Sequence, residues 1–147
     1  MLKVNNCLRI FDLSGNQCGH QVFSCIFEGL EHNTALLCLD VHMISLTSLG
    51  EGITHIAQAL KSNHSLQILN IYGLRLNRND TNLIFESLMF NSTLQRLHIS
   101  NIDSKIQSTF KRKRAANKLL PVDIVLKQQS DNHIVFGSID GYIIVEN

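Results

Sequence analysis

The apolar residues of this chain recur in a pattern that is 28 to 30 residues long. Leu8, Leu36, Leu66 and Leu94 stand in equivalent positions, at steps of 28, 30 and 28 residues. Each leucine opens the pattern Leu-x-x-apolar-x-apolar, and an asparagine stands three residues before it. The equivalent asparagines are Asn5, Asn33, Asn63 and Asn91. Four copies at so constant a step indicate an internal repeat.

Each copy predicts one short strand followed by one helix. The apolar core of the pattern, Phe11-x-Leu13 in the first copy, has the period of two that is typical of extended segments. About ten residues later the period becomes that of an amphipathic helix. The helical stripes are Phe23, Ile26, Phe27 and Leu30, then Ile53, Ile56, Ala57 and Leu60, then Thr81, Ile84, Phe85 and Leu88. Such a unit cannot bury its apolar face alone, so we expect the copies to stack and share one core.

The segment from Leu8 to Cys18 resembles the LxxLxLxxNxL/C signature of leucine-rich repeats. The long unit with a full helix resembles the ribonuclease-inhibitor subclass, which includes the repeats of NOD-like receptors, the ribonuclease inhibitor and Ran GTPase-activating proteins. The resemblance covers residues 5–104. It implies an α/β leucine-rich repeat solenoid of about three and a half units: a short horseshoe with parallel strands on the concave face and helices on the convex face.

One position departs from the signature. The consensus asparagine is present as Asn16, whereas the equivalent positions hold Ile44, Leu74 and Ile102. The resemblance implies that this asparagine bonds the backbone of the turn after the strand. We therefore expect the turns of copies two to four to be looser or to be held by other groups.

The region 105–147 differs from the repeats. Ile106 and Phe110 predict the start of a helix, Pro121 ends it, and Val122–Leu126 has the pattern of a strand. Two β-branched runs, 134–136 and 142–145, flank a glycine-bounded loop and predict a hairpin. We expect this region to be a helix plus a β-hairpin that caps the last repeat or forms a tail.

Parallel stacking would align the outward side chains of the strands in three columns. The columns are Ile10, Cys38, Ile68 and Arg96; Asp12, Asp40, Asn70 and His98; and Ser14, His42, Tyr72 and Ser100. The surface mixes apolar, aromatic and charged residues, and interfaces favour aromatic and arginine anchors. We predict a partner-binding face made of Ile10, Asp12, Ser14, Asp40, His42, Ile68, Asn70, Tyr72, Arg96 and His98. For each residue taken singly, an ordinary solvated strand face is the alternative.

The chain shows no constellation that predicts catalysis. Asp12 and Asp40 would be adjacent carboxylates, but no nucleophile, third ligand or phosphate-binding glycine loop accompanies them. His42 and His98 fall in different columns, and the four cysteines lack the CxxC spacing of zinc sites. We expect no enzymatic activity, no cofactor, no metal and no small-molecule substrate.

Charge and hydropathy narrow the partners and the compartment. The formal net charge is +1, so no global field favours nucleic acid or anionic membranes. No apolar run reaches the length of a membrane span or a signal peptide, which favours the cytoplasm. Four consecutive cations form a local basic patch: Lys111, Arg112, Lys113 and Arg114. They fit a solvated helix face, a favourable contact with the helix dipole, a nuclear-import signal or a phosphate contact.

These observations predict a protein–protein interaction module that binds a macromolecule on its concave strand face. The alternative is a regulator of a small GTPase, suggested by the resemblance to Ran GTPase activators. Arg9, Arg75 and Arg78 are the arginines considered for that role. The chain begins almost at a repeat boundary, with no capping segment before Leu8, which favours a piece of a larger receptor or scaffold.

Overall fold

Strands and helices alternate along the chain, as the repeat pattern predicts. The computed structural model describes residues 2–44, 50–100, 102–126, 135–139 and 142–145. A 3-10 turn, η1 (Leu2–Val4), precedes the first strand. The elements that follow are β1 (Ile10–Asp12), α1 (His20–His32), β2 (Cys38–Asp40), α2 (Gly52–Ser62), β3 (Ile68–Asn70), α3 (Arg78–Leu88), β4 (Arg96–Ile99), α4 (Ser104–Ala116), β5 (Asp123–Leu126), β6 (Val135–Ile139) and β7 (Tyr142–Val145).

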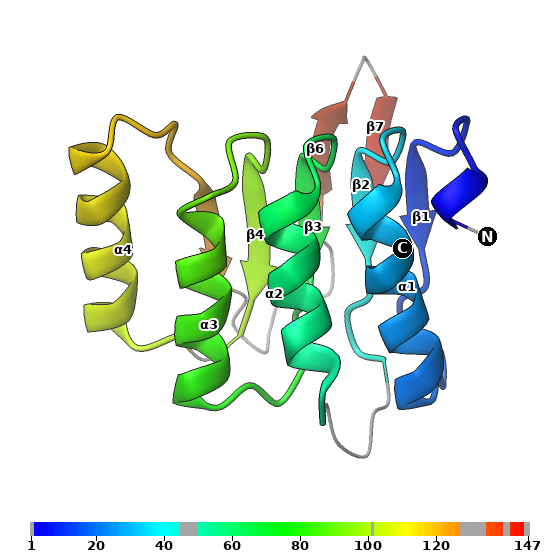
Figure 1. Cartoon of the computed structure of the whole chain (residues 1–147), viewed down its shortest axis with the longest axis horizontal. Coiled ribbons are helices and arrows are strands. Elements are labelled where there is room, and N and C mark those ends of the chain that lie inside the picture. Colours follow the sequence, from blue (N-terminus) through cyan, green and yellow to red (C-terminus); the bar gives the residue numbers. More distant parts are fainter. Residues whose placement is uncertain (1, 45–49, 101, 127–134, 140–141, 146–147) are drawn as a thin grey trace.

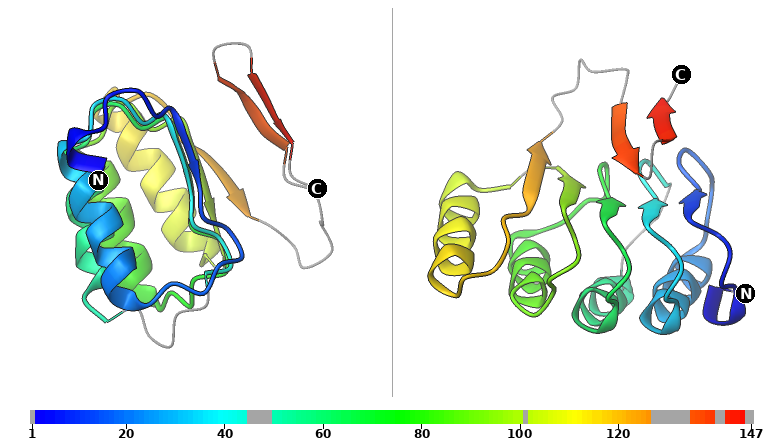
Figure 2. Two further views of the ribbon diagram at one scale, coloured as in Figure 1. Left: turned by 90° about the vertical axis from the view of Figure 1, so that its right-hand side faces the viewer. Right: turned by 90° about the horizontal axis from the view of Figure 1, so that it is seen from above.

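The first five strands form one parallel sheet in the order of the sequence, β1-β2-β3-β4-β5. Ile10 pairs with Cys38, Cys38 with Ile68, and Ile68 with Arg96, so the alignment of the columns is confirmed. Figures 1 and 2 show the four long helices on one side of this sheet, in a row that is wider than the row of strands. The fifth strand pairs with β4 through Leu97 and Ile124, so the array continues beyond residue 104.

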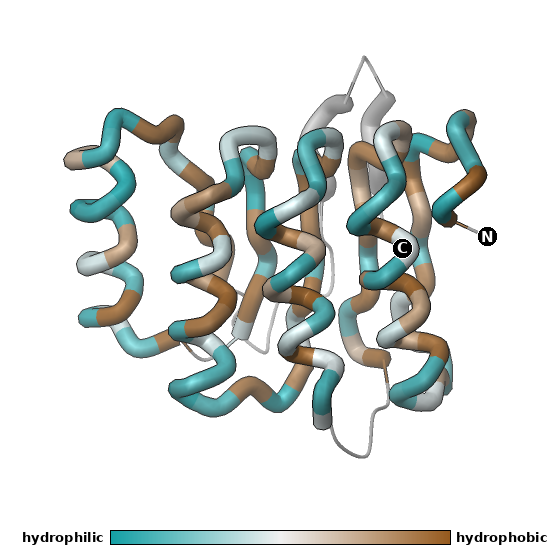
Figure 3. Tube along the Cα trace, in the orientation of Figure 1, coloured by the Kyte–Doolittle hydropathy of each residue, from teal (hydrophilic) through white to brown (hydrophobic). Residues whose placement is uncertain are grey.

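The core lies between the sheet and the helices. The repeat leucines Leu36, Leu66 and Leu94 are at most 2% exposed, and the predicted helical stripes are buried. Thr81 is buried in the apolar stripe of α3 because its hydroxyl donates to the carbonyl of Asn77 (3.0 Å). Apolar and polar residues alternate along α1, α2 and α3 in Figure 3, whereas α4 is more hydrophilic.

The chain after β5 contains the predicted hairpin. Strands β6 and β7 pair antiparallel, with Val135 opposite Val145 and Phe136 opposite Ile144. Ile134 and the polar spacer before it lie outside the described residues. In both views of Figure 2 the hairpin lies on the strand side of the sheet, opposite the helices, and not over the end of the row formed by β5 and α4.

Candidate functional site

Four of the ten predicted partner-binding residues, and Cys38 in the same columns, are closed to solvent on the strand side. The buried members of the columns are Cys38, Asp40, Ile68, Asn70 and His98, none of them more than 5% exposed. Ile10, Ser14, His42, Tyr72, Arg96 and Ser100 are half-buried, and Asp12 is exposed. The columns therefore divide into side chains that a partner can reach and side chains that it cannot reach in this arrangement of the chain.

The second column closes the turns that follow the strands. The Oδ1 atoms of Asp12 and Asp40 accept the backbone N–H groups of Ser14 and His42, each at 2.8 Å. Asn70 repeats this contact with the N–H of the residue two positions later, at 3.1 Å. Asp and Asn are the residue types that form this local turn. The column therefore stabilises the backbone in three successive repeats.

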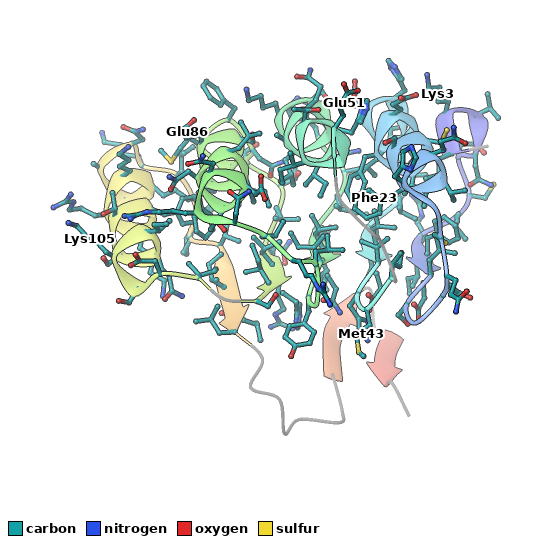
Figure 4. All side chains as sticks on the ribbon, turned by 90° about the horizontal axis from the view of Figure 1, so that it is seen from below. Lys3, Phe23, Met43, Glu51, Glu86 and Lys105 are labelled. Carbon is teal, nitrogen blue, oxygen red and sulfur yellow. The ribbon has the colours of Figure 1, made fainter. Side chains whose placement is uncertain are left out.

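Each of these turns then passes through a left-handed backbone conformation. Gly15, Met43 and Gly73 occupy equivalent positions, with φ values of +67°, +51° and +81°. Glycine adopts this conformation without strain, whereas methionine does so at a cost. Met43 also leaves 62% of its surface exposed, and Figure 4 shows it on the strand side of the molecule.

The first turn differs from the others because of Asn16. Its Nδ2 donates to the carbonyls of Leu13 (3.0 Å) and Ser14 (3.3 Å), as the resemblance implies. In the next two copies Ile44 and Leu74 are buried in the core at 4% exposure. Copies two and three hold these turns without this asparagine, through Asp40 and Asn70, which make the contact that Asp12 makes in the first copy.

Asp40 also joins two repeats. Its Oδ1 lies 2.8 Å from Nδ1 of His42, and its Oδ2 accepts Nδ2 of Asn70 at 3.0 Å. Asp40 and Asp12, which were considered as a catalytic pair, are thus both hydrogen-bonded in the turns. A buried and fully engaged carboxylate is suited to fixing the register of the strands.

The first column is mainly apolar. Cys38 and Ile68 form a small buried cluster apart from the main core, with Ile10 and Leu37 packed against it. At the end of this column the Nε of Arg96 donates to Oδ2 of Asp123 at 3.2 Å, which links β4 to β5.

The repeat asparagines form a ladder on the opposite margin of the strands. Asn33, Asn63 and Asn91 are at most 3% exposed. Each Oδ1 accepts the N–H of its own repeat leucine at 2.7 Å. Each Nδ2 donates to two carbonyls of the preceding repeat; for Asn63 these belong to Leu30 (2.8 Å) and Asn33 (2.7 Å). One side chain thus satisfies four backbone groups and ties neighbouring units together.

Arg114 occupies the end of this ladder. The prediction that it belongs to a basic surface patch is wrong, because its side chain is buried. It is 2% exposed, and burial lowers the pKa of its guanidinium. Its Nη1 donates to the carbonyls of Leu88 and Asn91, the groups that an asparagine of a further repeat would bind. Its Nε and Nη2 donate to the carbonyl of Leu120 at 2.8 and 2.6 Å. The physical reason for its burial is that the rigid fork of its N–H donors matches carbonyls that have no other side-chain donor at the end of the ladder.

The other three members of the basic run lie at the surface. Lys111, Arg112 and Lys113 are exposed on α4.

Among the described residues, no three His, Cys, Asp or Glu side chains are placed to hold a metal ion. Within the same part of the chain, no helix has both the length and the apolar character needed to cross a membrane.

Comparisons with known proteins give a likeness of fold. No family model matches the sequence, and no curated protein matches it significantly. Among solved structures, the chain is similar to "Leiomodin-1 Actin-Binding Site 2 (ABS2)", with a TM-score of 0.68 and 24% sequence identity. The match covers 80% of this chain and 69% of that chain. A likeness at this identity shows a common α/β arrangement with a parallel sheet.

Proposed function

We propose that this chain is a protein-binding module built from leucine-rich repeats of the ribonuclease-inhibitor type, and that its partner contacts the strand side. We define the strand-side surface as the exposed or half-buried residues Ile10, Asp12, Ser14, His42, Met43, Tyr72 and Arg96. The observation that carries the proposal is that these residues lie on, or directly after, four successive parallel strands, on the side of the sheet that the helices leave uncovered and on which the hairpin β6–β7 also lies.

The chemistry of the strand-side surface suits a protein partner. Tyr72, Met43 and Arg96 belong to the residue types that are enriched at interfaces and among their energetic anchors. The backbone groups of the turns are satisfied from within the chain by the second column, so a partner does not have to complete the fold. We expect binding without turnover, because Asp12 and Asp40 serve these turns.

Monomeric actin is the first partner to test, because the neighbour of known structure is an actin-binding site by its title. The alternative of a small-GTPase regulator has less to support it. Arg9 donates to the carbonyl of Ala35 at 2.8 Å, and Arg78 lies 3.9 Å from Asp103. Arg75 is exposed, and exposure alone does not favour a GTPase over another partner.

The test compares variants of the strand-side surface with a variant of the helix side. Met43→Asn removes apolar surface and keeps a residue that tolerates the left-handed backbone. Arg96→Ala removes a cation from the far end of the surface. Val22→Ser is the matched control, because Val22 is 51% exposed on α1 and outside the strand-side surface. Binding to monomeric actin is measured by calorimetry, and cytosolic partners are captured in parallel and identified by mass spectrometry.

We expect a partner that binds the parent chain and the Val22→Ser control, and whose affinity falls about tenfold or more in the other two variants, which corresponds to ~1.4 kcal/mol. If monomeric actin does not bind the parent chain, the captured proteins become the candidates for the partner. If every captured protein binds all three variants as it binds the parent chain, the strand-side proposal is wrong.

A further inference from the structure

A groove lies between α3 and α4 on the helix side, away from the strand-side surface. Phe85 and Phe110 form its base, with ring centroids 4.6 Å apart and 20° between the ring planes. Both rings are only 4% exposed, whereas Met89 and Ile106 beside them are half-buried and add accessible apolar surface. We call this site the α3–α4 groove.

The size of the α3–α4 groove favours one class of ligand. Its volume is about 200 Å³. Pockets that enclose drug-sized molecules usually measure ~300–1,000 Å³. A groove of the smaller size can accept one or two apolar side chains of a peptide, while the rest of that peptide stays on the surface.

The rim of the α3–α4 groove is mostly positive. Arg78, Lys105 and Lys113 line it together with a single carboxylate, Glu86. Figure 4 shows Glu86 on α3 and Lys105 on the neighbouring helix α4. The side chain of Arg78 is 69% exposed, and its Nη2 lies 3.9 Å from Oδ2 of Asp103. The cations of the rim are therefore accessible to an added anion.

Helix α4 concentrates this charge. It contains five of the chain's 13 lysines and arginines and no acidic residue, although the whole chain carries a net charge of only +1. One of the five, Arg114, is buried at the end of the asparagine ladder, where it donates hydrogen bonds to backbone carbonyls. The other four are exposed, and Lys105 and Lys113 belong to the α3–α4 groove. The local field thus attracts an acidic partner that the overall charge does not predict.

We propose that the α3–α4 groove binds an acidic peptide segment that carries one or two large apolar anchors. The anchors contact Met89 and Ile106 above the aromatic base, and Asp or Glu side chains pair with Arg78, Lys105 and Lys113. This site is separate from the strand-side surface, so the module can hold two partners or two segments of one partner.

The apolar residues of the α3–α4 groove favour a peptide over a nucleic acid as its ligand. Phosphates alone would pair with the cations, but they would leave Met89 and Ile106 uncovered. Proteins that bind single strands present aromatic faces on which bases stack. Phe85 and Phe110 instead stack on each other and are buried, so they offer no such platform.

The experiment begins with an unbiased selection. A displayed library of random 12-residue peptides is selected on the full chain, and enriched peptides are synthesised with a fluorophore for polarisation measurements. The groove variant is Lys105→Glu with Lys113→Glu. Its matched control is Lys111→Glu with Arg112→Glu, the same change in charge on the same helix at exposed positions outside the groove. Circular dichroism checks that both double variants fold.

We expect enriched peptides that combine Asp or Glu with Leu or Phe. Their affinity should fall at least tenfold in the groove variant and less than threefold in the control. Serine in place of the apolar anchors should also weaken binding about tenfold. Met43→Asn on the strand side should leave the affinity of these peptides unchanged. This result distinguishes the α3–α4 groove from the proposed binding site on the strand-side surface.

Four results would overturn the inference. They are a selection without acidic and apolar enrichment, equal losses in the two double variants, peptides that bind as well without their apolar anchors, and an oligonucleotide that binds more tightly than the peptides with the same dependence on Lys105 and Lys113.

Discussion

Replacing Arg114 with alanine tests whether a buried arginine completes the asparagine ladder. The change removes the donors to the carbonyls of Leu88 and Asn91, two residues that are at most 1% exposed. A buried carbonyl left without a partner costs about 1–3 kcal/mol. The carbonyl of Leu88 keeps the backbone N–H of Asn91 at 3.3 Å, so only the carbonyl of Asn91 is left without a partner. The guanidinium no longer has to be desolvated, which offsets part of this cost. We expect a net loss of about 1–3 kcal/mol in the free energy of unfolding, against the 5–15 kcal/mol typical of a whole domain.

The assay is urea denaturation followed by circular dichroism, together with hydrogen exchange. The variant should lose amide protection first in α4 and β5, because stacked units are coupled mainly to their neighbours. Arg114→Lys keeps the charge but loses the planar fork of donors, so its stability should lie between that of alanine and the parent chain. Arg112→Ala, on the exposed side of the same helix, is the control and should change stability by less than about 0.5 kcal/mol. The assignment of Arg114 fails if its alanine variant is as stable as this control.

Three further substitutions test the repeat geometry, the first two by the same denaturation assay. Asn63→Ala removes four hydrogen bonds between one buried side chain and backbone groups, and we expect a loss of about 2–4 kcal/mol. A loss below ~1 kcal/mol would contradict the ladder. Gly73→Ala should lower the free energy of unfolding more than Gly15→Ala does. Both glycines have a left-handed backbone, but only at Gly73 would the new Cβ lie 3.3 Å from the turn of the preceding repeat. Equal losses of stability would refute the steric part of this account. Gly29→Ala would place a Cβ 2.9 Å from that of Leu2, which should displace the N-terminal turn. Protease cleavage of that turn should therefore become faster. An unchanged cleavage rate would show that the turn does not depend on this close approach.

The repeat itself could be predicted from the sequence because its signals are local. A step of 28 to 30 residues, a period of two and then a period of 3.6 identify the strands and helices before any contact is known. The same step fixes which strand residues lie side by side, and the observed pairing of Asp12 with Asp40 and of Asp40 with Asn70 follows it. The asparagine before each leucine was also visible as a pattern, although its contacts with the preceding repeat were not.

The candidate site was less predictable, because a column on a strand says which side a residue faces and not what else covers that side. Asp40 and Asn70 face away from the main core as expected, yet they are buried and bonded to each other. Only Asp12, at the first strand, is exposed in that column. The signal that sequence reasoning missed was the type of residue: Asp and Asn two positions before a turn amide are suited to bonding it.

The sequence by itself determined the units of this protein, their length and their order, since these depend on patterns within about thirty residues. Only the tertiary structure decided how the row ends. A run of four cations carries no mark that distinguishes Arg114 from its neighbours, and its burial depends on carbonyls 23 and 26 residues earlier that no other side chain binds. Stacking likewise brings α4 against α3 and creates a groove that neither helix contains alone. Periodicity records the environment within a unit, whereas hydrogen bonds and grooves between units exist only after the units have packed.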